Sequence, residues 1–283
     1  MENLNGTSTH NSTDSYVAVL VWYFLPTVVT VPPLAIPANA LVIRLLLRKP
    51  GICSTSEIFI LHLALSDIMF CFMVISEYIR FLLNHTAEAG KFLAWGMNQS
   101  GGPMLLCILS LDCYVAVCHP LLFIRLKDPK LRLSLCLLVL VVTAVCSIIA
   151  KVSVWYRWNV MFGLLSSATV TITTCNILIL KSLCQSGPSN KEVHPVKKRA
   201  FKTVLTALVL INIHYLIPCL EYLIRVFGPS QFKPHSFLTS ISYLVLSLGS
   251  FVQPLCYLVR TKQLPEMRCD RCTAAETKTV ATV

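Results

Sequence analysis

The amino-acid sequence predicts an all-α membrane protein, a bundle of seven transmembrane helices with the N-terminus outside and the C-terminus inside. Of its 283 residues, 55% are hydrophobic and 13% are charged, and the mean hydropathy is +0.69. A soluble domain usually carries about 25% charged residues, so this composition argues against a water-soluble enzyme and also against a disordered chain. The length suits about seven spans of some 20–25 residues joined by short loops.

Seven apolar segments follow one another along the chain, and each is about long enough to cross a hydrocarbon core of about 30 Å. Asp67 is the one charged residue inside them. Buried helices of a soluble protein are the alternative, but seven such segments in succession make it improbable. The segments are Val17–Ile43, Phe59–Ile75, Phe92–Leu111, Leu133–Ala150, Asn159–Leu180, Thr203–Leu220 and Phe237–Val259.

The distribution of basic residues sets the orientation. Eighteen of the 24 Lys and Arg residues lie in the loops and tail of one side, and six lie on the other. Because Lys and Arg concentrate in cytoplasmic loops, residues 1–15 form an extracellular N-terminus, 16–260 the membrane domain and 261–283 a cytoplasmic tail with a short amphipathic helix. The net charge of +11 then reports topology, and we expect membrane lipids but no nucleic acid as partners.

Modification motifs agree with this topology. Three N-glycosylation sequons lie on the side predicted to be external, whereas a fourth, at Asn98, lies inside the third segment, where membrane depth should prevent modification. Two cysteines beyond the last segment favour palmitoylation over half of a zinc site. The expected sites are Asn5, Asn11 and Asn84 for glycans and Cys269 and Cys272 for palmitate.

The sequence contains no motif that predicts an enzyme. It has no Gly-x-Ser-x-Gly, no His-Glu-x-x-His and no P-loop, which are patterns that position nucleophiles, metals and phosphates. We therefore expect a protein that is not an enzyme.

Short motifs recur in order along the segments. They are Ala38-Asn39-Ala40-Leu41-Val42, Leu63-Ala64-Leu65-Ser66-Asp67, Asp112-Cys113-Tyr114 followed by His119-Pro120-Leu121, Pro218 in the sixth segment, and Gln253-Pro254-Leu255-Cys256-Tyr257. They are similar to the Gly-Asn-x-x-Val, Leu-Ala-x-x-Asp, Asp-Arg-Tyr and Asn-Pro-x-x-Tyr motifs of rhodopsin-like (class A) G-protein-coupled receptors. The chain resembles that family over about residues 16–272.

The resemblance implies a plasma-membrane receptor that binds an extracellular ligand in the outer half of the bundle and signals to heterotrimeric G proteins. It assigns coupling to Asp112, Cys113, Tyr114 and Leu121, with coupling weakened because Cys113 replaces the usual Arg. A non-signalling or decoy receptor of the same fold is one alternative, and a small seven-span transporter or channel is another. The subfamily stays open between odorant-like receptors and nucleotide, lipid or protease-activated receptors.

A second group of residues is expected to form an activation switch. Unpaired polar groups are costly at membrane depth, so Asn39 and Asp67 should bond to each other, to Ser250 or to water, and prolines should kink the last two spans. The resemblance implies a sodium ion at Asp67 and Ser250, with structural hydrogen bonding as the alternative, and we expect no other cofactor. The switch residues are Asn39, Asp67, Pro218, Gln253, Pro254 and Tyr257.

Departures from the family lead to three further expectations. No cysteine lies in an outer loop, so the outer surface should lack a disulfide. The second outer loop should be very short, at about Lys151–Trp158. Asp112 should pair with Arg125 or Lys127 of the second inner loop, because the Arg usually beside it is missing.

The ligand should bind where the outer halves of the spans converge. Arg80 and Arg225 suit an anionic ligand such as a carboxylate or phosphate. They could instead reach lipid headgroups or pair with Glu77 and Glu221. The candidate contacts are Glu77, Tyr78, Arg80, Trp95, Gln99, Glu221, Tyr222, Arg225, Tyr243 and Ser247.

Overall fold

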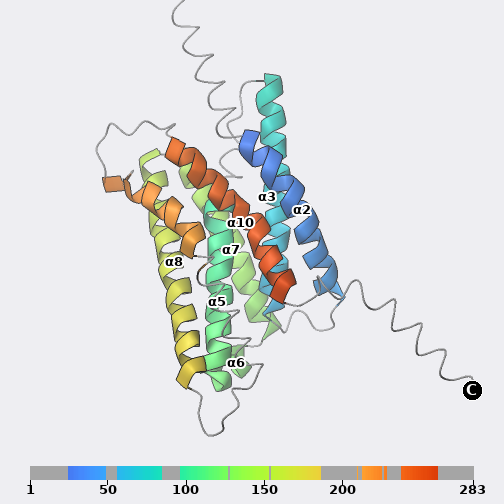
Figure 1. Ribbon diagram of the computed structural model, residues 1–283, viewed down its shortest axis with the longest axis vertical. Coiled ribbons are helices and arrows are strands. Elements are labelled where there is room, and N and C mark those ends of the chain that lie inside the picture. Colours follow the sequence, from blue (N-terminus) through green and yellow to red (C-terminus); the bar gives the residue numbers. More distant parts are fainter. Residues whose placement is uncertain are drawn as a thin grey trace, which may run out of the picture.

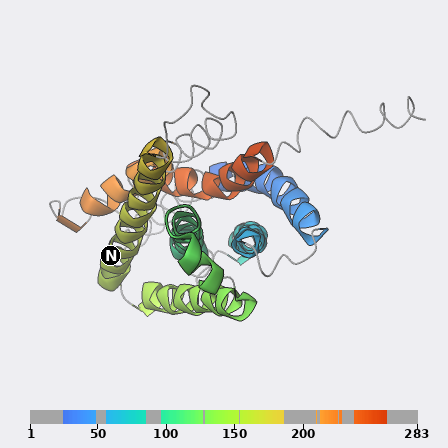
Figure 2. The same cartoon turned by 90° about the horizontal axis from the view of Figure 1, so that it is seen from below.

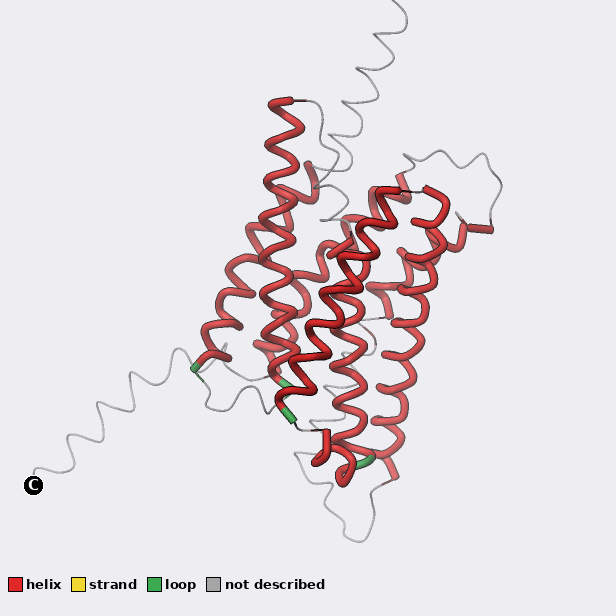
Figure 3. Tube along the Cα trace, turned by 180° about the vertical axis from the view of Figure 1, so that it is seen from behind, coloured by secondary structure: helices red, strands yellow, loops and turns green. Residues whose placement is uncertain are grey.

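The computed structural model describes residues 25–48, 56–84, 96–126, 128–152, 154–185, 209, 212–224, 226–227 and 237–260. Every regular element within this part of the chain is a helix (Figure 3). The helices are α2 (Leu25–Leu47), α3 (Glu57–Asn84), the π-helix η3 (Met97–Gly101), α5 (Gly102–Cys118), α6 (Pro120–Leu126), α7 (Pro129–Val152), α8 (Val154–Gln185) and α10 (Phe237–Arg260). Residues 212–224 are also helical.

Six stretches of the described chain are long and apolar enough to cross a membrane. They confirm an all-helical membrane bundle, and each corresponds to one of the predicted segments. Of the predicted segment Thr203–Leu220, residues 209 and 212–220 are described, and they are helical. The stretches are Leu25–Leu47, Glu57–Arg80, Met97–Cys118, Pro129–Val152, Asn159–Ser182 and Ser240–Val259.

The long helices lie roughly alongside one another (Figure 1). Seen from below, α3 and α5 occupy the middle, with α2 on one flank, α8 on the other and α7 lying across one side (Figure 2). α2 packs along α3 and α10, and α5 packs along α8. The largest buried apolar cluster joins α3, α5, α7, α8 and α10 with Tyr215 and Tyr222 of residues 212–224. Leucines and valines on the outer face of α7 stay exposed, as expected for a surface that faces lipid.

Several helices extend beyond the predicted apolar segments. α3 continues to Asn84, and α8 begins at Val154. Most of the predicted loop Lys151–Trp158 is therefore helical, which makes this connection even shorter than expected. Polar and amphipathic residues can extend a helix into the interfacial region, so the apolar length marks the membrane-depth part and not the helix ends.

The third span begins with a π-helical turn. The N–H of Gly102 bonds to the carbonyl of Met97, five residues earlier. The next residue, Pro103, has no N–H, and its ring would crowd the carbonyl four residues before it in an α-helix. A wide turn relieves this conflict, and such turns often occur near functional sites. The turn places Asn98 and Gln99 in the interior of the bundle.

A sharp bend at His119 separates α5 from α6, the short helix that precedes the fourth span. α5 ends before Pro120, because a residue that precedes proline avoids the α conformation, and Pro120 then opens α6. Asp128 next accepts a 2.9 Å hydrogen bond from the N–H of Lys130. It thereby caps α7, whose first residue is Pro129. The sequence thus specifies a short helix, α6, between two long ones.

The cysteines of the described residues are all free thiols. Cys136, Cys146 and Cys175 are buried among apolar side chains. They act as small core residues.

Candidate functional site

A polar network at the centre of the bundle begins with the break in α10 at Pro254. Proline has no N–H, so the carbonyl of Ser250, four residues earlier, loses its helical hydrogen bond. The amide Nδ2 of Asn39 on α2 donates to this carbonyl at 2.8 Å, and also to the carbonyl of Ala35 at 3.0 Å. The buried side chain of Asn39 in α2 therefore supplies a hydrogen bond to the Ser250 carbonyl of α10.

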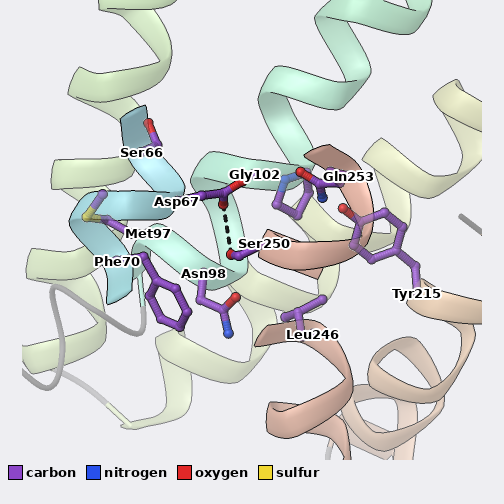
Figure 4. Close-up of a pocket in the computed structure, with 11 residues that line it drawn as sticks. Ser66, Asp67, Phe70, Met97, Asn98, Gly102, Tyr215, Leu246, Ser250 and Gln253 are labelled. Carbon is purple, nitrogen blue, oxygen red and sulfur yellow. Dashed lines mark hydrogen bonds between the residues drawn. The ribbon is translucent and has the colours of Figure 1, made fainter. Parts of the chain in front are cut away.

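Asp67 enters the same network from α3. Its Oδ1 accepts a 2.8 Å hydrogen bond from the hydroxyl of Ser250 (Figure 4). Ser250 thus joins three helices, because its hydroxyl bonds to Asp67 and its carbonyl accepts from Asn39. The expectation that Asn39 and Asp67 bond to Ser250 is confirmed.

A small cavity lies beside this network (Figure 4). It offers about 20 Å³ to the centre of a water molecule, which is room for about one ordered water. Three of the lining side chains have oxygens without a hydrogen-bond partner among the described residues: Oδ2 of Asp67, the hydroxyl of Tyr215 and Oε1 of Gln253. The lining residues are Ser66, Asp67, Phe70, Met97, Asn98, Gly102, Pro103, Tyr215, Leu246, Ser250 and Gln253.

Two glycines near this network, Gly102 and Gly249, differ in the space that a larger side chain would find at their positions. A Cβ on Gly102 would meet no heavy atom within 4 Å, so its side of the cavity is open. A Cβ on Gly249 would lie 2.6 Å from Nε2 of His214. The imidazole of His214 therefore occupies the space that a larger residue at 249 would need. Neither glycine supplies a side-chain oxygen, so any sodium ion would depend on the other lining residues, of which Asp67 is the one carboxylate.

Near the end of α5 that precedes α6, Asp112 pairs with Arg132 of α7. Nη2 of Arg132 donates to Oδ1 of Asp112 at 2.9 Å. Arg132 thus stands where Arg125 was expected, because Arg125 is exposed on α6; the alternative, Lys127, lies outside the described residues. The first turn of α7 instead points Arg132 toward α5, where it is buried.

The other coupling candidates surround the start of α6. The Tyr114 hydroxyl and Nε2 of His119 lie 3.2 Å apart, and their rings meet edge to face. Cys113 is half-buried beside Asp112, and Leu121 is 81% exposed. The structure thus brings all four predicted residues to one end of the bundle, around α6.

A further contact joins the inner ends of α3 and α10. The hydroxyl of Tyr257 donates to Oε1 of Glu57 at 3.2 Å. Reasoning from the sequence singled out Tyr257 but not its partner, because 200 residues separate the two along the chain.

The predicted ligand-binding residues differ in how far they are buried. Gln99, Tyr222 and Ser247 are buried, and Ser247 accepts a 3.0 Å hydrogen bond from Nδ2 of Asn98. Glu77 is buried, with its carboxylate 3.5 Å from Nη1 of Arg80, whose side chain is 55% exposed. This pairing is the alternative considered for Arg80. Tyr78 and Tyr243 are half-buried, and Glu221 is buried.

Several predicted sites lie outside the described residues. They are the glycosylation sites Asn5 and Asn11, the ligand candidates Trp95 and Arg225, and the palmitoylation sites Cys269 and Cys272. Asn84 ends α3, but its side chain is not described. The sequon at Asn98 has a structural role, because this amide is buried and bonded to Ser247.

Comparisons with known proteins agree with these features. Residues 38–159 match the family model of the 7 transmembrane receptor (rhodopsin family). Mouse G-protein coupled receptor 15 is 26% identical over 71% of this chain and 62% of its own length. Mouse lysophosphatidic acid receptor 5 is 29% identical over 36% of this chain and 29% of its own length. Human olfactory receptor 9Q1 is 23% identical over 65% of this chain and 58% of its own length. The chain thus spans less than two thirds of each of these relatives.

The described part of the chain is an all-helical bundle of apolar spans, with a buried Asn–Asp–Ser network beside a proline of α10. The chain is similar to the rhodopsin family of seven-transmembrane receptors over residues 38–159 and to G-protein-coupled receptors over longer stretches. Its apolar helices and its similarity to these receptors support a multi-pass membrane protein. Its relatives come from different receptor groups, so they leave the subfamily open.

Proposed function

We propose that this receptor has seven spans and an external N-terminus, binds an extracellular ligand between its outer helix ends, and signals to a heterotrimeric G protein. The observation that carries the proposal is the α6 surface, which we define as the exposed side chains Leu121, Leu122, Ile124 and Arg125. Exposed apolar residues next to a basic one suit a protein partner with apolar and acidic groups. A cytoplasmic position for α6 agrees with the excess of basic residues on its side of the membrane.

The ligand that we propose is anionic. Arg80 is exposed at the outer end of α3, and its partner Glu77 holds it at 3.5 Å. A contact of this length and exposure is weak, so a phosphate or carboxylate could displace it. One relative is named for lysophosphatidic acid, which carries a phosphate and is the natural first probe.

A second candidate function is a receptor that binds ligand without signalling. Cys113 is the observation that favours it, because a thiol supplies neither the fixed charge nor the donors of an arginine. The two candidates differ in one measurable property, which is nucleotide exchange on a G protein.

We expect Leu121→Ala to slow receptor-stimulated nucleotide exchange by about tenfold, as for the loss of one well-packed interface anchor. The measurement uses the full chain in nanodiscs and purified G-protein heterotrimers, with and without lysophosphatidic acid. Leu131→Ala is the matched control, since this leucine is exposed near the same end but lies on α7. If neither the natural chain nor Cys113→Arg exceeds the exchange rate of the G protein alone, the chain does not signal.

We further propose that Asp67 and Ser250 serve structural hydrogen bonding and hold no sodium ion in the natural chain. Gly102→Ser should introduce a sodium response, because the new hydroxyl enters the open side of the cavity. The measurement is the melting temperature in sodium chloride against choline chloride at equal ionic strength. The natural chain should show no difference, and the variant should be more stable in sodium. A sodium-dependent rise in the natural chain that Asp67→Asn removes would contradict the proposal.

A further inference from the structure

We propose that Arg132 is a positioning residue that caps α6 and fixes the α6 surface against the bundle. The inference rests on the proposed function only in the role that it gives to α6. The placement of α6 itself is argued from contacts. One guanidinium contacts three neighbouring elements, α3, α5 and α6, in addition to its own helix.

The first contact is electrostatic. Arg132 is 1% exposed, and its Nη2 lies 2.9 Å from Oδ1 of Asp112 on α5. A buried charge is costly unless it is paired, so each of these residues depends on the other. The pair therefore joins the start of α7 to the inner end of α5.

The second set of contacts reaches α6. Nε of Arg132 donates to the carbonyl of Leu126 at 3.4 Å. Leu126 is the last residue of α6, and the final carbonyls of a helix have no partner within it. Arg132 therefore supplies both a donor and a positive charge at the end where the helix dipole favours a cation.

The guanidinium also lies between two aromatic rings. Its central carbon is 5.4 Å from the ring centroid of Phe123 on α6 and 5.8 Å from that of Phe59 on α3. Both distances lie within the range of a cation–π contact. A planar guanidinium stacks on such rings in a way that an ammonium group cannot.

The position of Arg132 in its own helix does not account for its burial. It lies in the first turn of α7, where a cation opposes the helix dipole. A seven-residue helix such as α6 is also too short to be stable alone. Contacts with Asp112, Phe123 and Leu126 explain both facts, because α6 gains its order from the arginine that α7 contributes.

The test is hydrogen–deuterium exchange of the α6 amides in the full chain in nanodiscs. Arg132→Met should raise exchange in residues 120–126 by about tenfold, since the cap and the ring contacts are lost. Arg132→Lys should give an intermediate value, because its ammonium can pair with Asp112 but cannot stack between the rings. Arg125→Met removes the same charge from an exposed position and should leave α6 unchanged.

A double variant distinguishes the loss of α6 positioning from the cost of leaving the Asp112 carboxylate without its partner Arg132. Asp112→Asn combined with Arg132→Met leaves no buried charge, so this protein should fold even if Arg132→Met alone does not. Its α6 amides should still exchange faster than in the natural chain. Natural protection of α6 in the double variant, or in a folded Arg132→Met protein, would overturn the proposal.

Nucleotide exchange on a G protein distinguishes this inference from the proposed function. Faster deuterium exchange in α6 together with slower nucleotide exchange is the expected result for Arg132→Met. If α6 loosens while Leu121→Ala has no effect on nucleotide exchange, Arg132 still positions α6 and the assignment of the α6 surface to the G protein fails.

Discussion

Asn39→Leu should lower the free energy of unfolding by about 2–4 kcal/mol, since it removes one bond between helices and leaves a buried carbonyl unsatisfied. Leucine keeps most of the volume of asparagine but cannot donate to the carbonyl of Ser250, 2.8 Å away. That carbonyl has no alternative donor in its own helix, because Pro254 occupies the position that would provide one. The measurement is the midpoint of thermal unfolding of the purified receptor in detergent or nanodiscs.

The matched control is Asn176→Leu. Asn176 is also a buried asparagine that donates to the carbonyl four residues earlier, in this case of Ile172. It differs from Asn39 in that no bond from its amide to another helix is present in the described part of the structure. We expect this variant to lose much less stability than Asn39→Leu. Equal losses would show that the bond to Ser250 contributes little and that both changes act through local packing.

The hydrogen bonds of Asp67 could be anticipated from the sequence, because a polar side chain at membrane depth has few possible partners. A charged or amide side chain in an apolar segment must find a polar partner, and the serines of the last span, Ser250 among them, can provide one. Ser250 was accordingly expected as a partner of Asn39 and Asp67. The detail that Asn39 bonds to the serine's carbonyl needs the helix register, which places this carbonyl opposite the first span.

The partner of Asp112 could not be predicted in the same way. Proximity along the chain favoured Arg125 and Lys127, but α6 turns Arg125 toward solvent. Which basic residue faces α5 depends on where α7 begins, and the cap at Asp128 fixes that start. Contacts such as Asn98 with Ser247 and Tyr257 with Glu57 join residues more than 100 positions apart. These contacts depend on how the helices pack against one another. The hydrophobic periodicity of a single segment carries no information about that packing.

Cys113→Arg should raise G-protein nucleotide exchange by about ten- to a hundredfold. Each charge-assisted hydrogen bond that the new guanidinium makes to the partner contributes about 1.5–3 kcal/mol, which corresponds to that change in an equilibrium constant. Arg132 already engages Oδ1 of Asp112, so an arginine at 113 would compete for this acidic partner and be less restrained by it. Cys113 is half-buried at the end of α5 that carries α6, and a long side chain from there can extend toward a docked protein.

The control for this gain is Cys118→Arg, which introduces the same charge at another half-buried cysteine of α5. A general increase in basic charge would raise exchange in both variants, because electrostatic attraction acts on association with an acidic partner from many positions. A specific contact at the end of the third span would raise it in Cys113→Arg alone. Surface expression must be matched, since a buried charge can impair folding. If the natural chain already stimulates exchange as strongly as Cys113→Arg at equal receptor amounts, the thiol does not limit coupling, and the α6 surface with its basic neighbours suffices to engage the G protein.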